Sequence, residues 1–455
     1  MTTTQRRTRP VTRSLQIFLF VFAFGLGAVP GIANEVPPNI VLFIADDLGW
    51  ADCSVNGGRD IATPNMERLA KDGMTFSHAF VDSPSCAPSR AALLTGLHGA
   101  RSGSMFNHSK PLPEIKKWPA YFRELGYDVA AIGKTAHYAQ VKDYGFDHFS
   151  HFKYHEDDCV TAAVEWLERR ESAKPLCLIV GTNWPHVPWP EKSNYDPASL
   201  TLPQTLVSTP KTRQMRARYA EAVANADRDL GLVYDAALHK LGGNLFFLFS
   251  GDHGAQWPFG KWNCYDAGIR TPLIAVWKNK IDPASRSGAM VSWIDLLPTC
   301  LEAAGFKGRG SFDGRSFIPI LQGDRKDHRE EIFTQHSGDG RMNEFPMRSV
   351  RTRDWKYIRN LDPAREYHTH IDRAEAKGYW ESWERKAKND PAAARIVQRY
   401  LRRPAEELYD LAADPDELRN LADIEEHAAI RKELSRKVDE WMEATGDRGL
   451  QTKQP

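Results

Sequence analysis

Four short apolar runs, each followed by polar side chains, constrain the fold of this chain more than any other feature. They cover residues 38–45, 127–132, 176–180 and 244–249. Runs of this length, rich in β-branched and aromatic residues, are typical of strands that are buried on both faces. Such strands belong to parallel sheets covered by helices, so we predict an α/β fold with a mostly parallel central sheet between helices.

The polar residues after these runs are expected to meet at one edge of the sheet, because ligands bind beyond the carboxyl ends of parallel strands. Asp46 and Asp47 follow the first run, and Asp252 and His253 follow the fourth. Two adjacent carboxylates repel each other unless a cation lies nearby, and carboxylate oxygens suit a divalent metal. A plain acidic turn would explain the first pair alone, but Asp252 at a second strand end favours a metal site.

Three further candidate side chains follow the other runs. Lys134 comes just after the second run, and His186 lies in a loop rich in proline and tryptophan after the third. Lys261 lies shortly after the fourth run. A surface lysine or a loop histidine bonded to backbone would be the plain explanation for each, but their common placement past strand ends favours a single site.

The segment 85–96, Ser-Cys-Ala-Pro-Ser-Arg-Ala-Ala-Leu-Leu-Thr-Gly, places a cysteine at the start of a predicted helix. Pro88 suits the first helical turn, where its missing N–H costs nothing. Cys86 therefore lies where unpaired N–H groups and the helix dipole favour an anion or a thiolate. On this argument alone the position is an anion site or a reactive cysteine, and a buried structural cysteine is the plain alternative.

The order Cys-x-Pro-Ser-Arg followed by Leu-Thr-Gly closely resembles the signature of type I sulfatases, the formylglycine-dependent members of the alkaline phosphatase-like superfamily. Residues 63–70 and 268–273 resemble two further landmarks of that family. The resemblance covers nearly the whole mature chain. It implies the alkaline-phosphatase-like sandwich, with a smaller C-terminal α+β subdomain that contains an antiparallel sheet.

In that family a maturase oxidises the cysteine to formylglycine, and one hydroxyl of the hydrated aldehyde becomes the nucleophile. The resemblance implies that Cys86 undergoes this conversion and that one divalent ion, usually Ca2+, is bound. The implied metal ligands are Asp46, Asp47, Cys86, Asp252 and His253. Histidine at 253 is softer than the asparagine that is more common there, which leaves the identity of the metal open.

The resemblance also implies a role for each catalytic residue. The implied set is Cys86, Arg90, Lys134, His137, His186 and Lys261. Lys134, Lys261 and the metal would offset charge on the sulfate oxygens, and Arg90 would hold the nucleophile in place. His186 would protonate the leaving atom, and His137 would be the base that expels sulfate. The family usually has Gly-Lys-x-His, whereas His137 stands one residue later, so its orientation is open.

Charge balance, the N-terminal sequence and the cysteines indicate which binding partners and which cellular compartment to expect. Lysine and arginine total 60 against 59 acidic residues, which excludes a general polyanion-binding surface and argues against nucleic acid. Residues 1–33 combine a basic start, an apolar stretch and small residues, as an export signal does. The apolar stretch is short for a stable membrane anchor, so we expect a cleaved signal and a periplasmic or secreted protein. The six cysteines are irregularly spaced and predict no disulfide scaffold.

The predicted division of the chain is a signal peptide at 1–33, a catalytic domain at 34–340, a C-terminal subdomain at 341–446 and a tail at 447–455. Two short strands, at 347–352 and 355–359, are expected to open the subdomain. Helices are expected at 63–72, 213–241, 293–304 and 424–444. We expect the charged side chains of the 213–241 helix to face solvent.

A sulfated carbohydrate is the expected substrate. The segments 403–411 and 414–422 resemble the endings of heparan N-sulfatases (sulfamidases) and related bacterial glycan sulfatases. We therefore expect hydrolysis of a sulfate ester or an N-sulfate on a glycan fragment. Two alternatives stay open: a phosphonate monoester or phosphodiester hydrolase of the same superfamily, and a sulfated-glycan-binding protein without catalysis if Cys86 stays a thiol. The sugar, the sulfate position, exo or endo action and the oligomeric state are not predicted.

Overall fold

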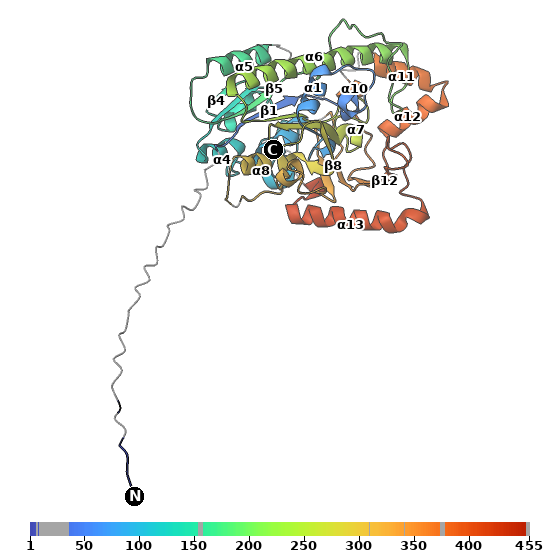
Figure 1. Ribbon diagram of the computed structural model, residues 1–455. Coiled ribbons are helices and arrows are strands. Elements are labelled where there is room, and N and C mark those ends of the chain that lie inside the picture. Colours follow the sequence, from blue (N-terminus) through green and yellow to red (C-terminus); the bar gives the residue numbers. More distant parts are fainter. Residues whose placement is uncertain are drawn as a thin grey trace. The chain divides into compact units, whose positions relative to one another are not determined.

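A computed structural model describes residues 1–5, 8, 36–152, 158–308, 310–340, 342–373 and 378–451. Residues from Pro37 onward form one compact unit. Its centre is an eight-stranded sheet in the order β4-β3-β5-β1-β6-β7-β2-β8 (Figure 1). The strands are β1 (Asn39–Ala45), β2 (Met74–Phe80), β3 (Asp128–Gly133), β4 (His148–Ser150), β5 (Leu176–Gly181), β6 (Leu245–Gly251), β7 (Arg270–Trp277) and β8 (Ser285–Ser292).

The four predicted strands are neighbours in this sheet and run parallel. β3 pairs with β5, β5 with β1 and β1 with β6, all in parallel register. β7 is antiparallel to both β6 and β2, which makes the sheet mixed but mostly parallel, as predicted. β2, β4 and β8 were not predicted, because their apolar residues are fewer or interrupted by polar ones, and β7 was not predicted although its residues 272–277 are all apolar.

Helices cover both faces of the central sheet. One face carries α1 (Pro64–Asp72), α5 (Asp158–Arg169) and α6 (Pro210–Leu241), and the other carries α2 (Cys86–Thr95), α4 (Trp118–Glu124) and α8 (Leu296–Ala303) (Figure 1). Alternate residues of each strand enter the two cores: Val41 and Phe43 lie in the first, Ile40 and Leu42 in the second. This two-sided burial explains the unbroken apolar runs in the sequence.

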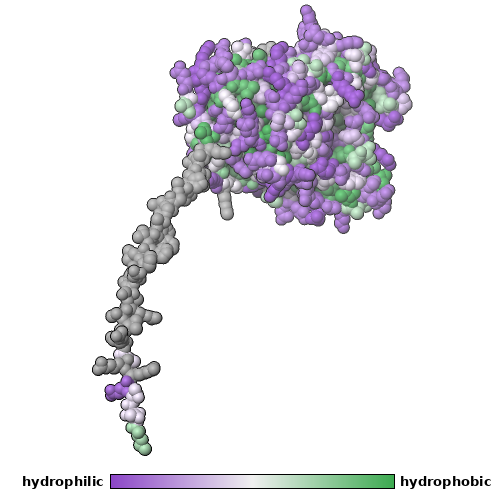
Figure 2. Space-filling view, viewed as in Figure 1, coloured by the Kyte–Doolittle hydropathy of each residue, from purple (hydrophilic) through white to green (hydrophobic). Residues whose placement is uncertain are grey.

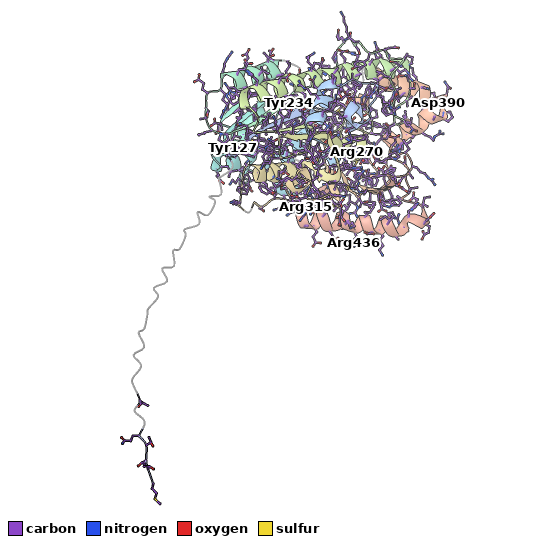
Figure 3. All side chains as sticks on the ribbon, in the orientation of Figure 1. Tyr127, Tyr234, Arg270, Arg315, Asp390 and Arg436 are labelled. Atoms are coloured by element: carbon purple, nitrogen blue, oxygen red, sulfur yellow. The ribbon has the colours of Figure 1, made fainter. Side chains whose placement is uncertain are left out.

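The long helix α6 corrects one expectation, because several of its charged side chains are buried. Arg216 Nη2 lies 2.6 Å from Asp52 Oδ1, and Asp227 accepts a hydrogen bond from Met66 N over 2.8 Å at the start of α1. Tyr234 of α6, labelled in Figure 3, packs its ring against Phe247 of β6. The buried charges of α6 therefore join neighbouring elements, while others, such as Arg228 and Asp235, are exposed as expected.

A smaller antiparallel sheet, in the order β12-β11-β10-β9, follows in the chain. Its strands are β9 (Ile332–His336), β10 (Met347–Arg351), β11 (Trp355–Asn360) and β12 (Glu406–Asp410), and α13 (Ala428–Thr445) packs on it (Figure 1). β9 precedes residue 341 and pairs with β10, so the sheet begins before the predicted start of the subdomain. The division at 340/341 itself stays a prediction.

The remaining elements are short. They are α3 (Gly99–Ser102), α7 (Asp266–Ile269), α9 (Ile318–Leu321), α10 (His370–Arg373), α11 (Tyr379–Ala387) and α12 (Pro391–Leu401). The 3-10 helices are η1 (Trp50–Asp52), η2 (Ser54–Asn56), η3 (Tyr138–Asp143), η4 (Trp293–Asp295), η5 (Glu425–His427) and η6 (Gly449–Gln451). The predicted helix at 293–304 is thus η4 followed by α8, and that at 424–444 is η5 followed by α13.

The surface of the compact unit that faces the viewer in Figure 2 is mainly polar, with apolar residues scattered among charged ones. Within the described part of the chain, no helix combines the length and the apolarity needed to cross a bilayer. The predicted signal at 1–33 falls almost wholly outside the described residues. All six cysteines lie in the described part, and each is a buried free thiol.

Candidate active site

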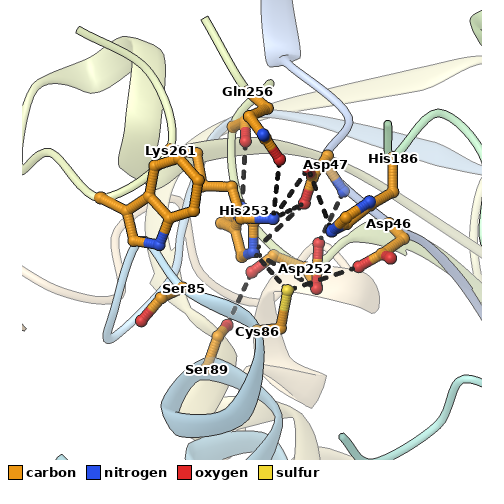
Figure 4. A network of polar contacts seen from close by, with 12 residues as sticks. Asp46, Asp47, Ser85, Cys86, Ser89, His186, Asp252, His253, Gln256 and Lys261 are labelled. Atoms are coloured by element: carbon orange, nitrogen blue, oxygen red, sulfur yellow. Dashed lines mark hydrogen bonds and ion pairs between the residues drawn. The ribbon is translucent and has the colours of Figure 1, made fainter. Parts of the chain in front are cut away.

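The carboxyl ends of the parallel strands and the start of α2 meet in one polar cluster. Asp46 and Asp47 follow β1, and Asp252 and His253 follow the end of β6 (Figure 4). Cys86 is the first residue of α2, directly below these side chains in the view. All five are at most 1% exposed. The structure thus brings together the five residues expected to bind a metal.

Cys86 lies in a positively charged environment. Its Sγ is 3.2 Å from His253 Nε2 and 3.6 Å from Lys134 Nζ. Burial opposes ionisation, but the charges of Lys134, Lys261 and His253 hold the pKa of the Cys86 thiol well below its usual value. Cys86 is also the first residue of α2, and the dipole of a helix favours negative charge at its N-terminus. The sulfur is therefore placed where an anionic or strongly polarised group is stabilised.

Three buried cations balance the three carboxylates. Arg90 bridges two of them, with Nη2 at 3.0 Å from Asp46 Oδ1 and Nε at 3.0 Å from Asp252 Oδ2. Lys134 Nζ lies 2.5 Å from Asp46 Oδ2. Lys261 Nζ lies 2.9 Å from both oxygens of Asp47 (Figure 4). Burial opposes protonation of Lys134, yet the charge of Asp46 raises its pKa above the ordinary value. Each charge is paired, as buried charges must be.

The donor set fits one divalent cation. Ligand atoms of Asp46, Cys86, Asp252 and His253 all lie within 4.8 Å of one another. His253 Nδ1 lies 3.0 Å from the carbonyl oxygen of Gly254, to which it donates, so that Nε2 faces the cluster, where a bound cation would take the place of its proton. Burial raises the pKa of Asp252 to about 7, and the charge of Asp46 adds to the rise. A cation would relieve this crowding of negative charge.

Two histidines flank the cluster. His186 donates from Nδ1 to the carbonyl oxygen of Val187 over 2.7 Å, which directs Nε2 toward Asp47 Oδ2 at 3.8 Å. His137 lies just before η3, and its ring interacts with the Cys86 side chain in spite of the extra residue after Lys134. Burial lowers the pKa of His137 to about 4. The structure therefore places both histidines beside the group expected to react.

Several polar residues near the cluster were not identified from the sequence. Gln256 Oε1 lies 3.4 Å from Lys261 Nζ, and the Tyr138 hydroxyl lies 3.4 Å from Lys134 Nζ. His108 contacts His137, and Asp339, from the segment after β9, contacts His108. Gln256 and Tyr138 lie within five residues of Lys261 and Lys134 but belong to no motif, whereas His108 and Asp339 approach the site from segments farther away in the sequence. Only the fold reveals them.

The central sheet is mostly parallel and carries helices on both faces. Its carboxyl edge holds carboxylates, cations and a cysteine at the start of a helix. Together these features define a metal-assisted hydrolase of the alkaline-phosphatase-like fold. Comparison with known proteins narrows the class. Residues 38–306 match the family model described as Sulfatase, and residues 251–385 match the one described as N-sulphoglucosamine sulphohydrolase, C-terminal.

Curated relatives agree with the family match. The chain is 30% identical over 429 residues to an ulvan-active sulfatase of Formosa agariphila, covering 90% of this chain and 81% of that protein. It is 26% identical over 476 residues to N-sulphoglucosamine sulphohydrolase of Homo sapiens, covering 92% of each chain. The chain therefore belongs to the sulfatase family and is a sulfuric ester hydrolase. Membership implies a divalent metal and a formylglycine residue.

Solved structures show the same fold. A protein solved in complex with its substrate D-glucosamine-2-N,6-O-disulfate superimposes with a TM-score of 0.70 at 20% identity, covering 90% of this chain and 99% of the other. The phosphonate monoester hydrolase of Agrobacterium radiobacter also reaches a TM-score of 0.70, at 18% identity, covering 90% of this chain and 96% of the other. At these identities the structural likeness establishes the fold alone. The sequence relatives, by contrast, favour sulfatase over phosphonate hydrolase.

Proposed function

We propose that this protein is an exported sulfatase that removes a sulfate group, as an ester or an N-sulfate, from a sulfated carbohydrate. Its Cys86 is converted to formylglycine by a maturase, and Ca2+ occupies the cluster of Asp46, Asp47, Asp252 and His253. The observation that carries the proposal is the setting of residue 86. It lies at a helix N-terminus, with metal-binding carboxylates on one side and two lysines within reach of a bound anion.

In this proposal the formylglycine, the metal and the surrounding side chains have separate roles. The hydrated formylglycine supplies a hydroxyl nucleophile, and the metal supplies positive charge that makes this hydroxyl more acidic. Lys134 and Lys261, whose charges both act on Cys86, bind the oxygens of the sulfate group. Arg90 holds Asp46 and Asp252 in place and so keeps the metal ligands in position.

The two histidines divide the proton transfers. His186 Nε2 points into the cluster beside Asp47 and donates a proton to the leaving oxygen or nitrogen of the sugar. His137 adjoins residue 86 itself and accepts the proton whose removal releases sulfate. An acid near the leaving group and a base near the nucleophile are what a two-step hydrolysis requires.

Calcium is proposed from the chemistry of the ligands. Three of the four protein ligands other than residue 86 are carboxylates, which are hard oxygen donors that suit Ca2+. His253 is the single softer donor, so Mn2+ or Zn2+ are the competitors to test. Chelator-treated protein should regain activity best with Ca2+, and a clear preference for Mn2+ or Zn2+ would contradict the assignment.

The carbohydrate is proposed from the relatives, whose names point to sulfated glycans. Ulvan-active sulfatases and an N-sulphoglucosamine sulphohydrolase stand among them, and a structural neighbour binds a disulfated glucosamine. The first screen should therefore pair ulvan oligosaccharides with N-sulfated and O-sulfated glucosamine. Release of inorganic sulfate from an ulvan fragment alone, or from the N-sulfated sugar alone, would distinguish the O-sulfate from the N-sulfate assignment.

The decisive test has two parts. Mass spectrometry of the tryptic peptide 72–90, from protein made with the maturase, should show residue 86 with one oxygen in place of the sulfur and with two hydrogens fewer, one from the thiol and one from Cβ. The same protein should hydrolyse aryl sulfates faster than aryl phosphonates and phosphodiesters, and Cys86→Ala should be inactive. Faster phosphonate cleavage would favour the phosphonate monoester hydrolase. An unmodified thiol without any hydrolysis would favour a binding protein.

A further inference from the structure

Asp339 is a buried carboxylate at the edge of the active site, contributed by the segment between β9 and β10. It is 6% exposed. Trp262 Nε1 donates to its Oδ2 over 3.1 Å, and His108 Nε2 lies 3.2 Å from its Oδ1. Burial opposes ionisation, but the hydrogen bond from His108 holds the pKa of Asp339 at about 2. The carboxylate therefore only accepts hydrogen bonds, and the facing Nε2 of His108 carries a proton.

His108 in turn contacts His137. His108 Nδ1 and His137 Nε2 are 2.8 Å apart, so one proton lies between these two nitrogens. A neutral His108 whose proton is on Nε2 has a bare Nδ1, which accepts from His137 Nε2–H. A neutral His137 then has no proton on its own Nδ1. The hydrogen bond with Asp339 also raises the pKa of His108, so this order of protons holds at a pH at which His108 is neutral.

The remaining nitrogen of His137 is the one available to the reactive residue. His137 Nδ1 is buried and has no hydrogen-bond partner among the residues that the structure describes. His137 and Cys86 each shift the pKa of the other, so the two side chains are near neighbours, and His137 Nε2 is occupied by His108. A bare, buried imidazole nitrogen next to residue 86 is a proton acceptor, which is what a general base requires.

The geometry points to Asp339 and His108 as positioning residues of the catalytic base: hydrogen bonds from Asp339 through His108 hold His137 in the tautomer whose bare Nδ1 serves residue 86. This inference rests on the proposed sulfatase function. A proton accepted at Nδ1 is matched by passage of the Nε2 proton to His108 Nδ1. The positive charge then rests on His108, whose side chain is 62% exposed and lies beside Asp339. The region of the smaller sheet thereby contributes to the chemistry at the edge of the large one.

Asp339→Asn tests the inference, because the surrounding contacts dictate how the amide must lie. Its oxygen keeps the hydrogen bond from Trp262, and its NH2 group takes the place of Oδ1 and donates to His108 Nε2. His108 then carries its proton on Nδ1 and donates to His137 Nε2. His137 is left with its proton on Nδ1, which is the wrong tautomer for a base at residue 86.

The tautomers are read directly by 15N NMR of ring-labelled histidine, in protein made without the maturase so that Cys86 is a thiol. The wild type should show His137 protonated at Nε2, and Asp339→Asn should show it protonated at Nδ1. Asp372→Asn is the matched control, because Asp372 is a comparably buried acid whose Oδ2 lies 2.7 Å from His368 Nδ1. It should leave the His137 signals unchanged. A wild-type His137 protonated at Nδ1 would overturn the inference.

Kinetics of the converted, metal-loaded enzyme provide the second readout. Asp339→Asn should lower kcat about 100-fold or more with KM little changed, since loss of a general base costs about 10²–10⁴ in rate. Asp339→Glu keeps the anion and should recover part of kcat. His108 has φ +69°, a conformation that glycine adopts freely, so His108→Gly should fold, lose kcat and regain part of it when imidazole is added.

The outcomes separate the inference from the proposed function. A wild-type enzyme that releases sulfate, with Asp339→Asn equally active, would refute the positioning role and leave the sulfatase function intact. A converted wild type that hydrolyses no sulfate, with the tautomers as expected, would instead refute the proposed function. Thermal unfolding of each variant shows whether a loss of kcat comes from misfolding, because Asp339→Asn retains the contact with Trp262 and should melt close to the wild type.

Discussion

Arg90 offers the sharpest test of how the site is held together. Its side chain is fully buried, and it bridges Asp46 and Asp252 with hydrogen bonds of 3.0 Å. Arg90→Met keeps the volume of the side chain but removes its charge. Asp46 retains Lys134 at 2.5 Å, whereas Asp252 is left with His253 and the backbone N–H of Asp47. The substitution therefore leaves the buried carboxylate of Asp252 without its arginine partner.

The size of the effect follows from this geometry. Breaking a buried ion pair by removing one partner costs about 3–5 kcal/mol of unfolding free energy. The compact unit spans Pro37–Pro455, and an unfolding entropy of about 2.1 cal/mol/K per residue gives about 0.9 kcal/mol/K for the whole unit. A loss of about 4 kcal/mol then lowers Tm by about 4–5 °C. Arg90→Lys restores a charge without the two-pronged geometry and should lie between the wild type and Arg90→Met.

The assay is thermal unfolding with chelator present, so that no metal compensates the stranded carboxylate. Arg436→Met is the matched control, because Arg436, labelled in Figure 3, pairs with Glu440 one turn along α13 and its side chain is 58% exposed. An exposed pair of this kind contributes about 0.3–0.5 kcal/mol, so Tm should hardly move. Equal Tm values for Arg90→Met and Arg436→Met would refute the reasoning that Arg90 neutralises the metal ligands. Retained sulfatase activity in Arg90→Met would do the same.

Three further predictions concern the rest of the fold. Burial and nearby arginines lower the pKa of His78 from 6.5 to about 4. Because the unfolded chain therefore binds a proton at a higher pH than the folded one, stability should fall as pH drops from about 6.5 to 4. In urea unfolding, His78→Gln should show a smaller loss of stability over this pH range. Gly133→Ala should destabilise strongly and abolish activity, because a Cβ there would lie 2.1 Å from the carbonyl oxygen of Gly181 and force β3 from β5 next to Lys134. Gly126→Ala, also at positive φ but in open space, should cost only about 1 kcal/mol, and similar losses for the two would contradict the packing argument. Thr209→Ala removes the side-chain cap of α6 and should cost about 1 kcal/mol in urea unfolding; no change would mean that the cap is not used in solution.

The sequence was most informative where a pattern is local. The apolar runs that became β1, β3, β5 and β6 were recognisable because strands buried on both faces have no polar alternation. The helix that begins at Cys86 was recognisable from Pro88 and from the sulfatase signature Cys-x-Pro-Ser-Arg. The strands β2 and β8 were missed, because polar residues interrupt their apolar pattern and pairing with strands far away in the chain stabilises them. β7 has an unbroken apolar run at 272–277 and was missed in spite of it.

The sequence by itself determined which chemical groups the site contains: the carboxylates, lysines and histidines that follow strands, and a cysteine at a helix start, all marked by short-range patterns. Only the tertiary structure decided how they are coupled. It paired each buried carboxylate with a particular cation, joined His137 to His108, and brought Asp339 from beyond β9 to His108. The physical reason is that helix starts and strand ends are set by neighbours in the chain, whereas ion pairs and proton positions depend on side chains that only folding brings together.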